Sequence, residues 1–256
     1  MKLALYQGPS PAGDMALALK KVESVLSSAA MSDVQMVVFP ELFLPGYNQP
    51  DLHHSMAQPQ GGEWEQALRD IANTCGCGLT IGWAESDNGR YYNAASCFDQ
   101  AGNKIAHYRK LQLFGAMEKT NFEFGESYTT FQWADFKVAL LICYDVEFSH
   151  HVQRLKNQGV SLLLVPTANP SQYDNVSKLL VPARAFESGT SIVYANYCGH
   201  EGDLHYSGLS LIVGPDGEPI AQAGRGEALL IADLDHISNI DPAVISTQHL
   251  DFREVT

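Results

Sequence analysis

The stretch VALLICYDVEF, residues 138–148, leads a continuous apolar run directly into a group of polar residues. The run predicts a buried strand over Lys137–Ile142, and Cys143 is the next residue. In layered α/β proteins, sites form where buried strands end. Cys143 is therefore a candidate nucleophile, although a cysteine that ends a buried strand is often only a small apolar group.

Two other polar residues follow strand-like segments in the same way. Glu41 lies in VVFPELFLPGY, residues 37–47, just after a strand that a proline ends. Lys110 lies in HYRKLQLFG, residues 107–115, after the second arm of a predicted hairpin. A thiol nucleophile needs a base and a cation or donor for its oxyanion, which a carboxylate and an ammonium supply. Alone, Glu41 is equally a loop carboxylate and Lys110 equally a solvated charge.

The rest of the chain alternates short apolar runs with helical patterns and turns, which indicates layered α/β architecture. About ten strands are expected, too many for one small doubly wound sheet, so two packed sheets with outer helices are predicted. The expected helices are one capped by Asp14 and running to about Ala30, then Glu63–Cys75, Ser149–Asn157 and Asp174–Ser188, with Pro182 as a kink or true start in the last.

Composition excludes several classes of function. The 256 residues are 45% hydrophobic and 18% charged, enough apolar material for a sizeable core. A net charge of −13 opposes binding to a phosphate backbone, so no nucleic-acid partner is expected. The sequence has no basic cluster for an anionic membrane and no apolar run near the roughly 20 residues of a bilayer span. We expect no membrane association.

Cysteine usage and the N-terminus indicate a cytoplasmic location. The chain has five cysteines, an odd number, and its start reads as a first strand over Lys2–Gln7, with no secretory signal. Reduced thiols are therefore expected. Cys198 also follows a predicted strand and is a rival nucleophile, but its own segment offers no base.

Other site types are weakly indicated. Two adjacent His pairs, at 53–54 and 150–151, are poor joint metal ligands, and no P-loop or G-x-S-x-G sequence is present.

The three segments resemble those of the carbon–nitrogen hydrolases of the nitrilase superfamily, whose hallmark is a Glu–Lys–Cys triad. Further segments are similar in family order: PTANP (166–170), ARAFES (183–188), YANYCG (194–199) and GLSLIVGPDGEPIAQAG (208–224). The resemblance extends to about residue 233. It implies a four-layer α-β-β-α sandwich, formed as a single carbon–nitrogen hydrolase domain over residues 1–256.

The resemblance also implies residue roles. Glu41 is the general base, Lys110 the oxyanion-stabilising cation and Cys143 the nucleophile. Glu118, eight positions after the lysine, corresponds to a second acidic residue of amidase members, although it is otherwise an ordinary loop carboxylate. The backbone N–H of Tyr144 is the implied second oxyanion donor. The chemistry is acyl transfer through a thioester, with no metal or organic cofactor.

Residues after the cysteine bear on the substrate. True nitrilases typically have Cys-Trp-Glu, whereas this chain has Cys-Tyr-Asp, and members that bind carboxylated substrates often have Arg near the position of Glu147. Glu147 in the pocket would favour a cationic group such as a primary amine; the alternative is a salt bridge to Arg154 or Arg184. The segments look similar to amidases acting on 5-aminopentanamide and to stereoselective amidases.

Two further pocket candidates are Asn169 and Tyr47. Asn169 either faces the substrate or only satisfies turn backbone, and Tyr47 either lines the entrance or only packs. The expected partner is a small amide. The alternatives are a nitrilase or an N-carbamoyl amine hydrolase with the same triad, and a non-catalytic binding scaffold. The resemblance further implies a homodimer or higher homo-oligomer with Ser149–Asn157 at the contact, while the segment 238–256 matches the family poorly.

Overall fold

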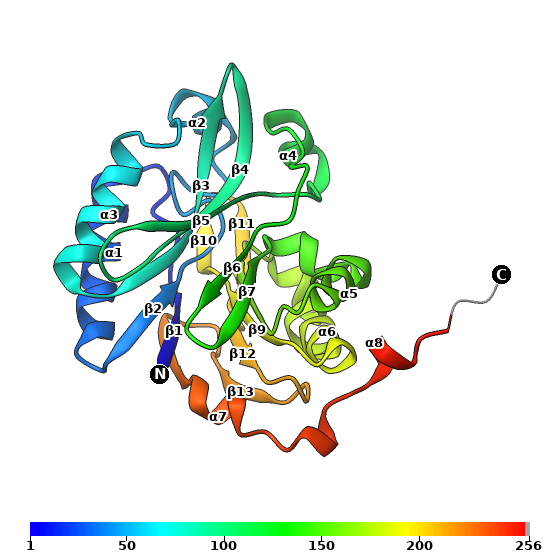
Figure 1. Ribbon diagram of the computed structural model, residues 1–256. Helices are drawn as coiled ribbons and strands as arrows, with labels where there is room; N and C mark the ends of the chain where they lie inside the picture. Colours follow the sequence, from blue (N-terminus) through cyan, green and yellow to red (C-terminus); the bar gives the residue numbers. More distant parts are fainter. Residues whose placement is uncertain (254–256) are drawn as a thin grey trace.

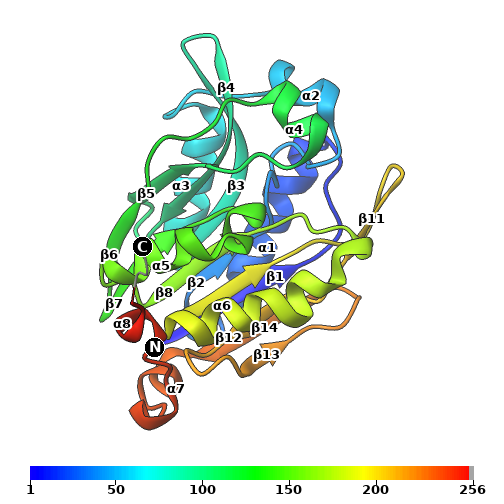
Figure 2. The same cartoon turned by 90° about the vertical axis from the view of Figure 1, so that its right-hand side faces the viewer.

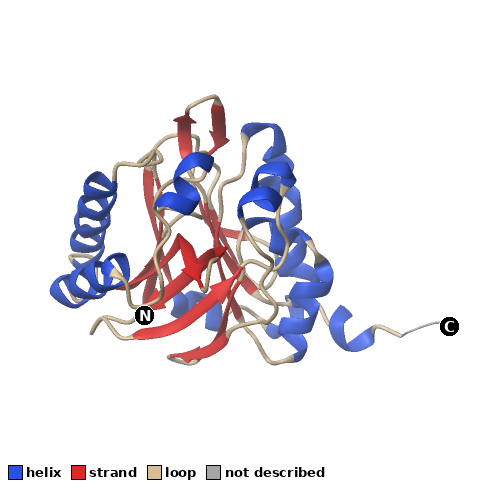
Figure 3. Ribbon diagram, turned by 90° about the horizontal axis from the view of Figure 1, so that it is seen from above, coloured by secondary structure: helices blue, strands red, loops and turns tan. Residues whose placement is uncertain are grey.

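The computed structural model describes residues 1–253, without the side chains of residues 236 and 238, and consists of four layers (Figure 1). Two six-stranded sheets face each other in the middle and helices cover their outer faces (Figure 3). The first sheet contains, in spatial order, β14 (Ala228–Asp233), β1 (Lys2–Gln7), β2 (Val34–Val38), β3 (Gly78–Asp87), β4 (Arg90–Phe98) and β5 (Lys104–Arg109). The second contains β13 (Pro219–Gln222), β12 (Leu211–Val213), β9 (Ser191–Ala195), β8 (Leu162–Pro166), β7 (Phe136–Leu140) and β6 (Thr130–Trp133).

Helices flank the sheets on both outer sides. The first sheet is covered by α1 (Met15–Ala30) and α3 (Glu63–Cys75), and the second by α5 (Ser149–Asn157) and α6 (Val181–Ser188) (Figure 1). The remaining elements are α2 (Pro50–Ser55), α4 (Gly115–Asn121), α7 (Leu234–Ser238), α8 (Gln248–Asp251), the hairpin β10 (Cys198–Glu201) and β11 (Leu204–Ser207), the 3-10 turns η1 (Cys143–Glu147), η2 (Ser171–Tyr173) and η4 (Pro242–Val244), and the π-helical turn η3 (Val176–Leu180). Among the described residues, no helix is long and apolar enough to cross a bilayer.

The core explains why these segments form strands. In the first sheet β1, β2 and β3 are parallel, and in the second β7, β8 and β9 are parallel. Parallel strands are covered on both faces, which requires the continuous apolar runs seen in the sequence. One apolar cluster lies between the sheets and continues to α5 and α6, and a second joins the first sheet to α1 and α3. The parallel strands in each sheet also direct their carboxyl ends to one edge.

The predicted fold class, a four-layer α/β sandwich, is confirmed. Asp14 caps α1, because its carboxylate accepts the Leu17 N–H at 2.9 Å. The segment predicted as a helix over Asp174–Ser188 is helical, with a π-helical turn over Val176–Leu180 and then α6; of the two alternatives for Pro182, the structure shows the helix start, since Pro182 lies in the first turn of α6. Proline has no N–H to donate, so it is accommodated at a helix start and not inside one.

The sequence left the course of the C-terminal segment open; in its described part, α8 packs on its own chain. Helix α8 lies against α5 and α6 (Figure 2). The last part of the predicted domain, residues 254–256, lies outside the described residues. The hairpin β10–β11 also escaped prediction: Cys198 comes after β9, as expected, but is itself the first residue of β10.

Candidate active site

Cys143 occupies a sharp turn directly after the second sheet. It follows the apolar end of β7 and is the first residue of η1. Its φ is +47°, a left-handed conformation that side-chain-bearing residues rarely adopt. The surrounding contacts must therefore hold this turn in place. The side chain is buried, with Thr167 and Ala168 of the loop after β8 beside the thiol.

Glu41 lies in the turn that follows β2, with its side chain fully buried. Its Oε1 accepts hydrogen bonds from Asn93 Nδ2 at 2.7 Å and from Lys110 Nζ at 2.5 Å. Its Oε2 has no partner among the described residues. The Glu41 N–H donates to the Thr167 carbonyl at 3.3 Å, so the carboxylate and the thiol both adjoin the same loop after β8.

Gly82 makes this approach of β3 to the Glu41 turn feasible. A Cβ at residue 82 would lie 2.4 Å from the Leu42 nitrogen and 2.7 Å from Glu41 Cα. Both of those atoms belong to backbone, which cannot swing aside as a side chain can. The glycine therefore allows the strand to pack directly beneath the carboxylate turn.

Lys110 follows β5 and is fully buried between two carboxylates. Its Nζ lies 2.5 Å from Glu41 Oε1 and 2.8 Å from Glu118 Oε1. Its backbone is also fixed, because its N–H donates to the Asn93 carbonyl at 2.9 Å. An ammonium has three donors, and the described hydrogen bonds use two of them.

Glu118 comes from α4 and is fully buried as well. Its Oε1 accepts from the Tyr47 hydroxyl at 2.8 Å, in addition to Lys110, and its Oε2 accepts from the Phe114 N–H at 3.1 Å. Glu118 is thus no loose loop carboxylate but the second wall of the lysine's site. Tyr47 likewise does more than pack, since it orients that carboxylate.

A narrow cavity of about 10 Å³ opens over the thiol. It is lined by Tyr47, Phe114, Cys143, Glu147, Ala168, Asn169, Pro170 and Tyr173. Its rim is aromatic, because the Phe114 ring makes edge contacts with Tyr144 and Tyr173 at centroid distances of 5.2 and 5.6 Å. Two larger hollows, of about 420 Å³ each, lie elsewhere, one beside β5 and one between α5 and α8.

Glu147 lines this cavity and forms no ion pair within the described part of the chain. The sequence allowed a salt bridge from Glu147 to Arg154 or Arg184 as the alternative to substrate recognition, and the structure has neither ion pair in its described part. Arg184 pairs with Glu187 at 3.0 Å and gives two further hydrogen bonds to the backbone carbonyl of Glu147. The Glu147 carboxylate therefore remains available to whatever enters the cavity.

Asn169 lies on the cavity wall and also bonds the loop backbone. Its Nδ2 donates to the Tyr173 carbonyl at 2.9 Å. Its backbone N–H donates to Asn196 Oδ1 at 2.8 Å, which ties the loop after β8 to the chain after β9. The loop that contacts the thiol is thus held from two sides.

Burial and neighbouring charges shift the pKa values of the central groups. Burial raises the pKa of Glu41 to about 7, although Lys110 opposes the shift. Burial also raises the pKa of the Cys143 thiol well above its usual range, with Glu41 adding to the shift and Lys110 opposing it. Burial alone would lower the pKa of Lys110, but Glu118 and Glu41 outweigh it and raise that pKa. At neutral pH the thiol is protonated and the ammonium charged.

Several residues of this site were not found by sequence reasoning. Asn93 lies mid-strand in β4 and reads as an ordinary strand position, yet it fixes both Glu41 and Lys110. Asp145 is fully buried, and burial raises its pKa to about 6. Gly82 and Asp145 carried one available signal each: a glycine inside a strand, and an acidic residue two positions after a candidate nucleophile.

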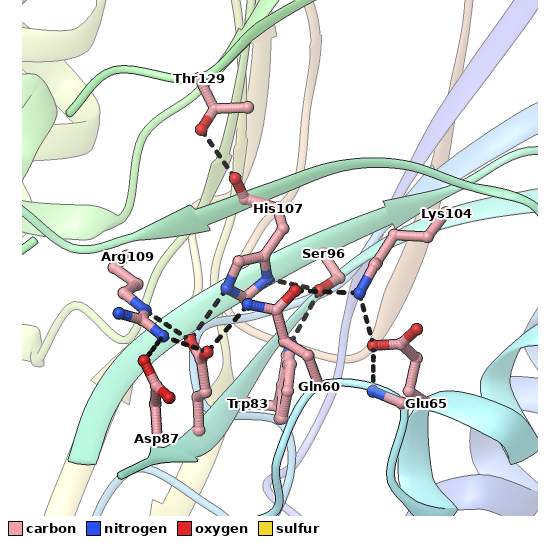
Figure 4. Close-up of polar contacts among 11 residues, drawn as sticks. Gln60, Glu65, Trp83, Asp87, Ser96, Lys104, His107, Arg109 and Thr129 are labelled. Carbon is pink, nitrogen blue, oxygen red and sulfur yellow. Dashed lines mark hydrogen bonds and ion pairs between the residues drawn. The ribbon is translucent and has the colours of Figure 1, made fainter. Parts of the chain in front are cut away.

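A second polar network lies on the helix-covered face of the first sheet, near the end of β5 (Figure 4). It joins Gln60, Glu65, Trp83, Glu85, Asp87, Ser96, Lys104, His107 and Arg109.

His107 connects Ser96 Oγ, at 3.0 Å, with Glu85 Oε2, at 2.8 Å. This order is that of a Ser–His–carboxylate relay, but Ser96 is fully buried and receives a hydrogen bond from Trp83 Nε1. The hydroxyl is closed to any substrate. The network instead anchors β5, the strand that Lys110 follows, since Arg109 donates to both oxygens of Glu85 at 2.9 and 2.6 Å.

No group of three or more His, Cys, Asp or Glu side chains in residues 1–253 is arranged to hold a metal ion.

The thiol, the ammonium and the carboxylates lie buried together where strands of the two sheets end. The chain belongs to the carbon–nitrogen hydrolase family, whose profile matches residues 2–238. It is a hydrolase of carbon–nitrogen bonds, and the predicted membership of the nitrilase superfamily is confirmed.

Relatives agree with this assignment. A Pseudomonas protegens protein described as a hydrolase in the pqqF 5' region is 40% identical over 238 residues, covering 92% of this chain and 83% of its own length. An (R)-stereoselective amidase from a Pseudomonas species is 31% identical over 236 residues, covering 92% of this chain and 85% of its own.

A solved structure is also similar to this chain in fold and in sequence. An amidase mutant from Nesterenkonia sp. AN1, in which acrylamide has added to the active-site cysteine, superposes with a TM-score of 0.87 at 32% identity, covering 95% of this chain and 98% of its own.

Proposed function

We propose that this chain hydrolyses a small aliphatic primary amide that carries an amino group, giving a carboxylic acid and ammonia through a thioester on Cys143. The observation that carries the proposal is the buried set of Glu41, Lys110 and Glu118 next to the thiol, with Glu147 unpaired on the cavity wall. The amidases among the relatives and structural neighbours support the reaction class.

In the acylation step, the Cys143 sulfur attacks the amide carbon and its proton passes to Glu41. The thiol's raised pKa means that no thiolate is present beforehand, so a base is required. The Oε2 of Glu41 suits this task, because Oε1 is engaged by Asn93 and Lys110 and Oε2 has no partner among the described residues.

The tetrahedral oxyanion needs positive charge and donors. Lys110 offers its remaining N–H, while Glu41 and Glu118 keep it charged and fixed in position. The Tyr144 N–H is the second donor; it lies in the first turn of η1, where a backbone N–H has no acceptor within the helix. Each such donor contributes about 3–4 kcal/mol to transition-state stabilisation.

The later steps reuse the same carboxyl group. Protonated Glu41 gives its proton to the nitrogen as the carbon–nitrogen bond breaks, and ammonia leaves. Glu41, ionised again, then accepts a proton from the water that attacks the thioester carbon. The second tetrahedral intermediate collapses to the carboxylic acid and returns the proton to sulfur. Adduct formation at the active-site cysteine of the Nesterenkonia amidase supports a nucleophilic thiol at this position.

The cavity's charge supports an amine on the substrate. Glu147 brings an unpaired carboxylate to a narrow space rimmed by Phe114 and Tyr173, and aromatic faces also attract ammonium groups. A carboxylate at the same end of the substrate would meet like charge.

The experiment is a comparison of ammonia release from ω-amino amides, neutral amides, nitriles and N-carbamoyl amines, with Cys143→Ala as the blank. The proposal expects the highest kcat/KM for an ω-amino amide, and a covalent mass increase equal to the acyl group on Cys143 when the reaction is quenched early. Carbon dioxide released together with ammonia would identify an N-carbamoyl amine hydrolase, and full activity of Cys143→Ala would refute the thioester.

We further propose a homodimer with α5 at the contact. Light scattering on the purified chain tests it, and a monomer at micromolar concentration contradicts it.

A further inference from the structure

Asp145 lies two residues after the thiol and uses both of its carboxylate oxygens. Its Oδ1 accepts the Gln112 N–H at 2.7 Å. Its Oδ2 accepts the Tyr108 hydroxyl at 2.7 Å and the Ile142 N–H at 3.0 Å. The side chain is fully buried, so these protein donors replace its water.

The donors come from two separate parts of the chain. Tyr108 and Gln112 stand two residues before and two residues after Lys110, while Ile142 immediately precedes Cys143. A single carboxylate therefore joins the turn that carries the thiol to the segment that carries the ammonium. The two segments come from different sheets, since Lys110 follows β5 and Cys143 follows β7.

The thiol turn needs such a restraint. Its positive φ at Cys143 is maintained only if neighbouring contacts outweigh the strain. Burial of a carboxylate costs desolvation free energy, whereas an apolar side chain of similar size would pack there without that cost. A fully bonded carboxylate, however, specifies one geometry where an apolar contact permits several.

We propose that Asp145 is a positioning residue. By bridging the two segments, it fixes the positions of Cys143 and the Tyr144 N–H relative to Lys110. The proposal rests on the proposed thioester function, because it concerns the alignment of that nucleophile with that cation. Asp145 acts through its neighbours and does not itself contact the substrate.

The test compares Asp145→Asn and Tyr108→Phe with Tyr6→Phe. Asparagine keeps the size of the side chain but turns an N–H₂ toward at least one of the three donors. Tyr108→Phe removes a single donor and leaves the hydrogen bonds from the Gln112 and Ile142 N–H groups to Asp145 intact. Tyr6→Phe is the matched control, because the Tyr6 hydroxyl also donates to a carboxylate, Glu227, at 2.7 Å, in a part of the fold away from the cavity.

The expected result is a fall in kcat of about 10- to 100-fold for Asp145→Asn, and a smaller fall for Tyr108→Phe, with KM within about threefold of the parent. The rate of Cys143 alkylation by iodoacetamide should fall as well, because the thiol moves relative to Glu41. Tyr6→Phe should keep kcat and the alkylation rate. Circular dichroism and the melting temperature give the folded fraction to which each rate is normalised.

The proposal is overturned if Tyr108→Phe and folded Asp145→Asn keep the parent's kcat and alkylation rate, or if Tyr6→Phe loses as much activity as Tyr108→Phe. If Asp145→Asn does not fold, Tyr108→Phe decides. Failure of the underlying function is recognised separately, since Cys143→Ala would then still release ammonia.

Discussion

Exchange of Glu147 for Gln tests the origin of substrate selectivity at a single carboxylate. The substitution keeps the side chain's size and removes its charge from the cavity wall. Arg184 should stay in place, because it donates to the Glu147 backbone carbonyl and pairs with Glu187. The fold and the thiol are therefore expected to be unaffected, and only a positively charged substrate end should lose a partner.

The magnitude follows from the state of the carboxylate. Glu147 is half-buried and has no cation paired with it in the described part of the chain, and burial raises its pKa. A substrate ammonium would supply the missing charge. A hydrogen bond between charged groups contributes about 1.5–3 kcal/mol, so kcat/KM for an ω-amino amide should fall about 10- to 150-fold. For neutral butyramide the change should stay below about threefold.

The assay measures initial rates of ammonia release from 5-aminopentanamide and butyramide at pH 7.5, for the parent, Glu147→Gln and the control Glu187→Gln. Glu187 shares Arg184 with Glu147 but does not line the cavity, so its exchange reports any indirect effect through the arginine. Equal losses for the two amides in Glu147→Gln, or equal losses in both variants, would show that Glu147 does not recognise an amine.

Three further perturbations test the centre of the site. Because burial raises the pKa of Glu41 to about 7 and a base must be ionised to accept the thiol proton, kcat/KM should fall about tenfold per pH unit below 7 and level off above it; a pH-independent rate from 5 to 8 would remove Glu41 as the base. Lys110→Gln should lower kcat about 100- to 1,000-fold through loss of the oxyanion cation, and a loss confined to KM would contradict that role. Gly82→Ala should destabilise the fold by about 1–3 kcal/mol in urea titration, because the new Cβ meets the backbone at Leu42 and Glu41; an unchanged midpoint would show that β3 does not press on that turn.

Much of the fold was predictable because its core segments are strongly periodic. Helices α1, α3 and α5 follow from apolar spacing, helped in α1 by the Asp14 cap. The hairpin β10–β11 has no comparable pattern, since its strands are short and mixed in polarity and depend on pairing with each other. Its existence is decided by tertiary contacts, which local sequence does not encode.

The residues of the candidate site likewise fall into those that the sequence predicted and those that only tertiary contacts reveal. Glu41, Lys110 and Cys143 became candidates because each follows a predicted strand and the three form a chemically complete set, and the family resemblance then implied their roles. Asn93 was missed because the residues next to it in sequence are typical of an ordinary strand. Its importance comes from its hydrogen bond to Glu41, which is distant in the sequence. The free state of Glu147 was equally hidden: sequence offers nearby arginines, but only the structure shows that Arg184 bonds the backbone and not the carboxylate.

The charge balance around the thiol connects these features. One ammonium, that of Lys110, serves a region with four carboxyl groups, those of Glu41, Glu118, Asp145 and Glu147. Burial is the main cause that raises the pKa of the thiol and of Glu41; Glu41 adds to the shift at the thiol and Glu118 adds to it at Glu41, while Lys110 opposes both. A protonated nucleophile whose proton leaves only as the carbon is attacked is therefore favoured. The excess of carboxyl groups repels a carboxylated substrate and attracts an ammonium. Base catalysis at Glu41 and amine preference at Glu147 are therefore both expected to depend on the excess of buried carboxyl groups over cations around the thiol.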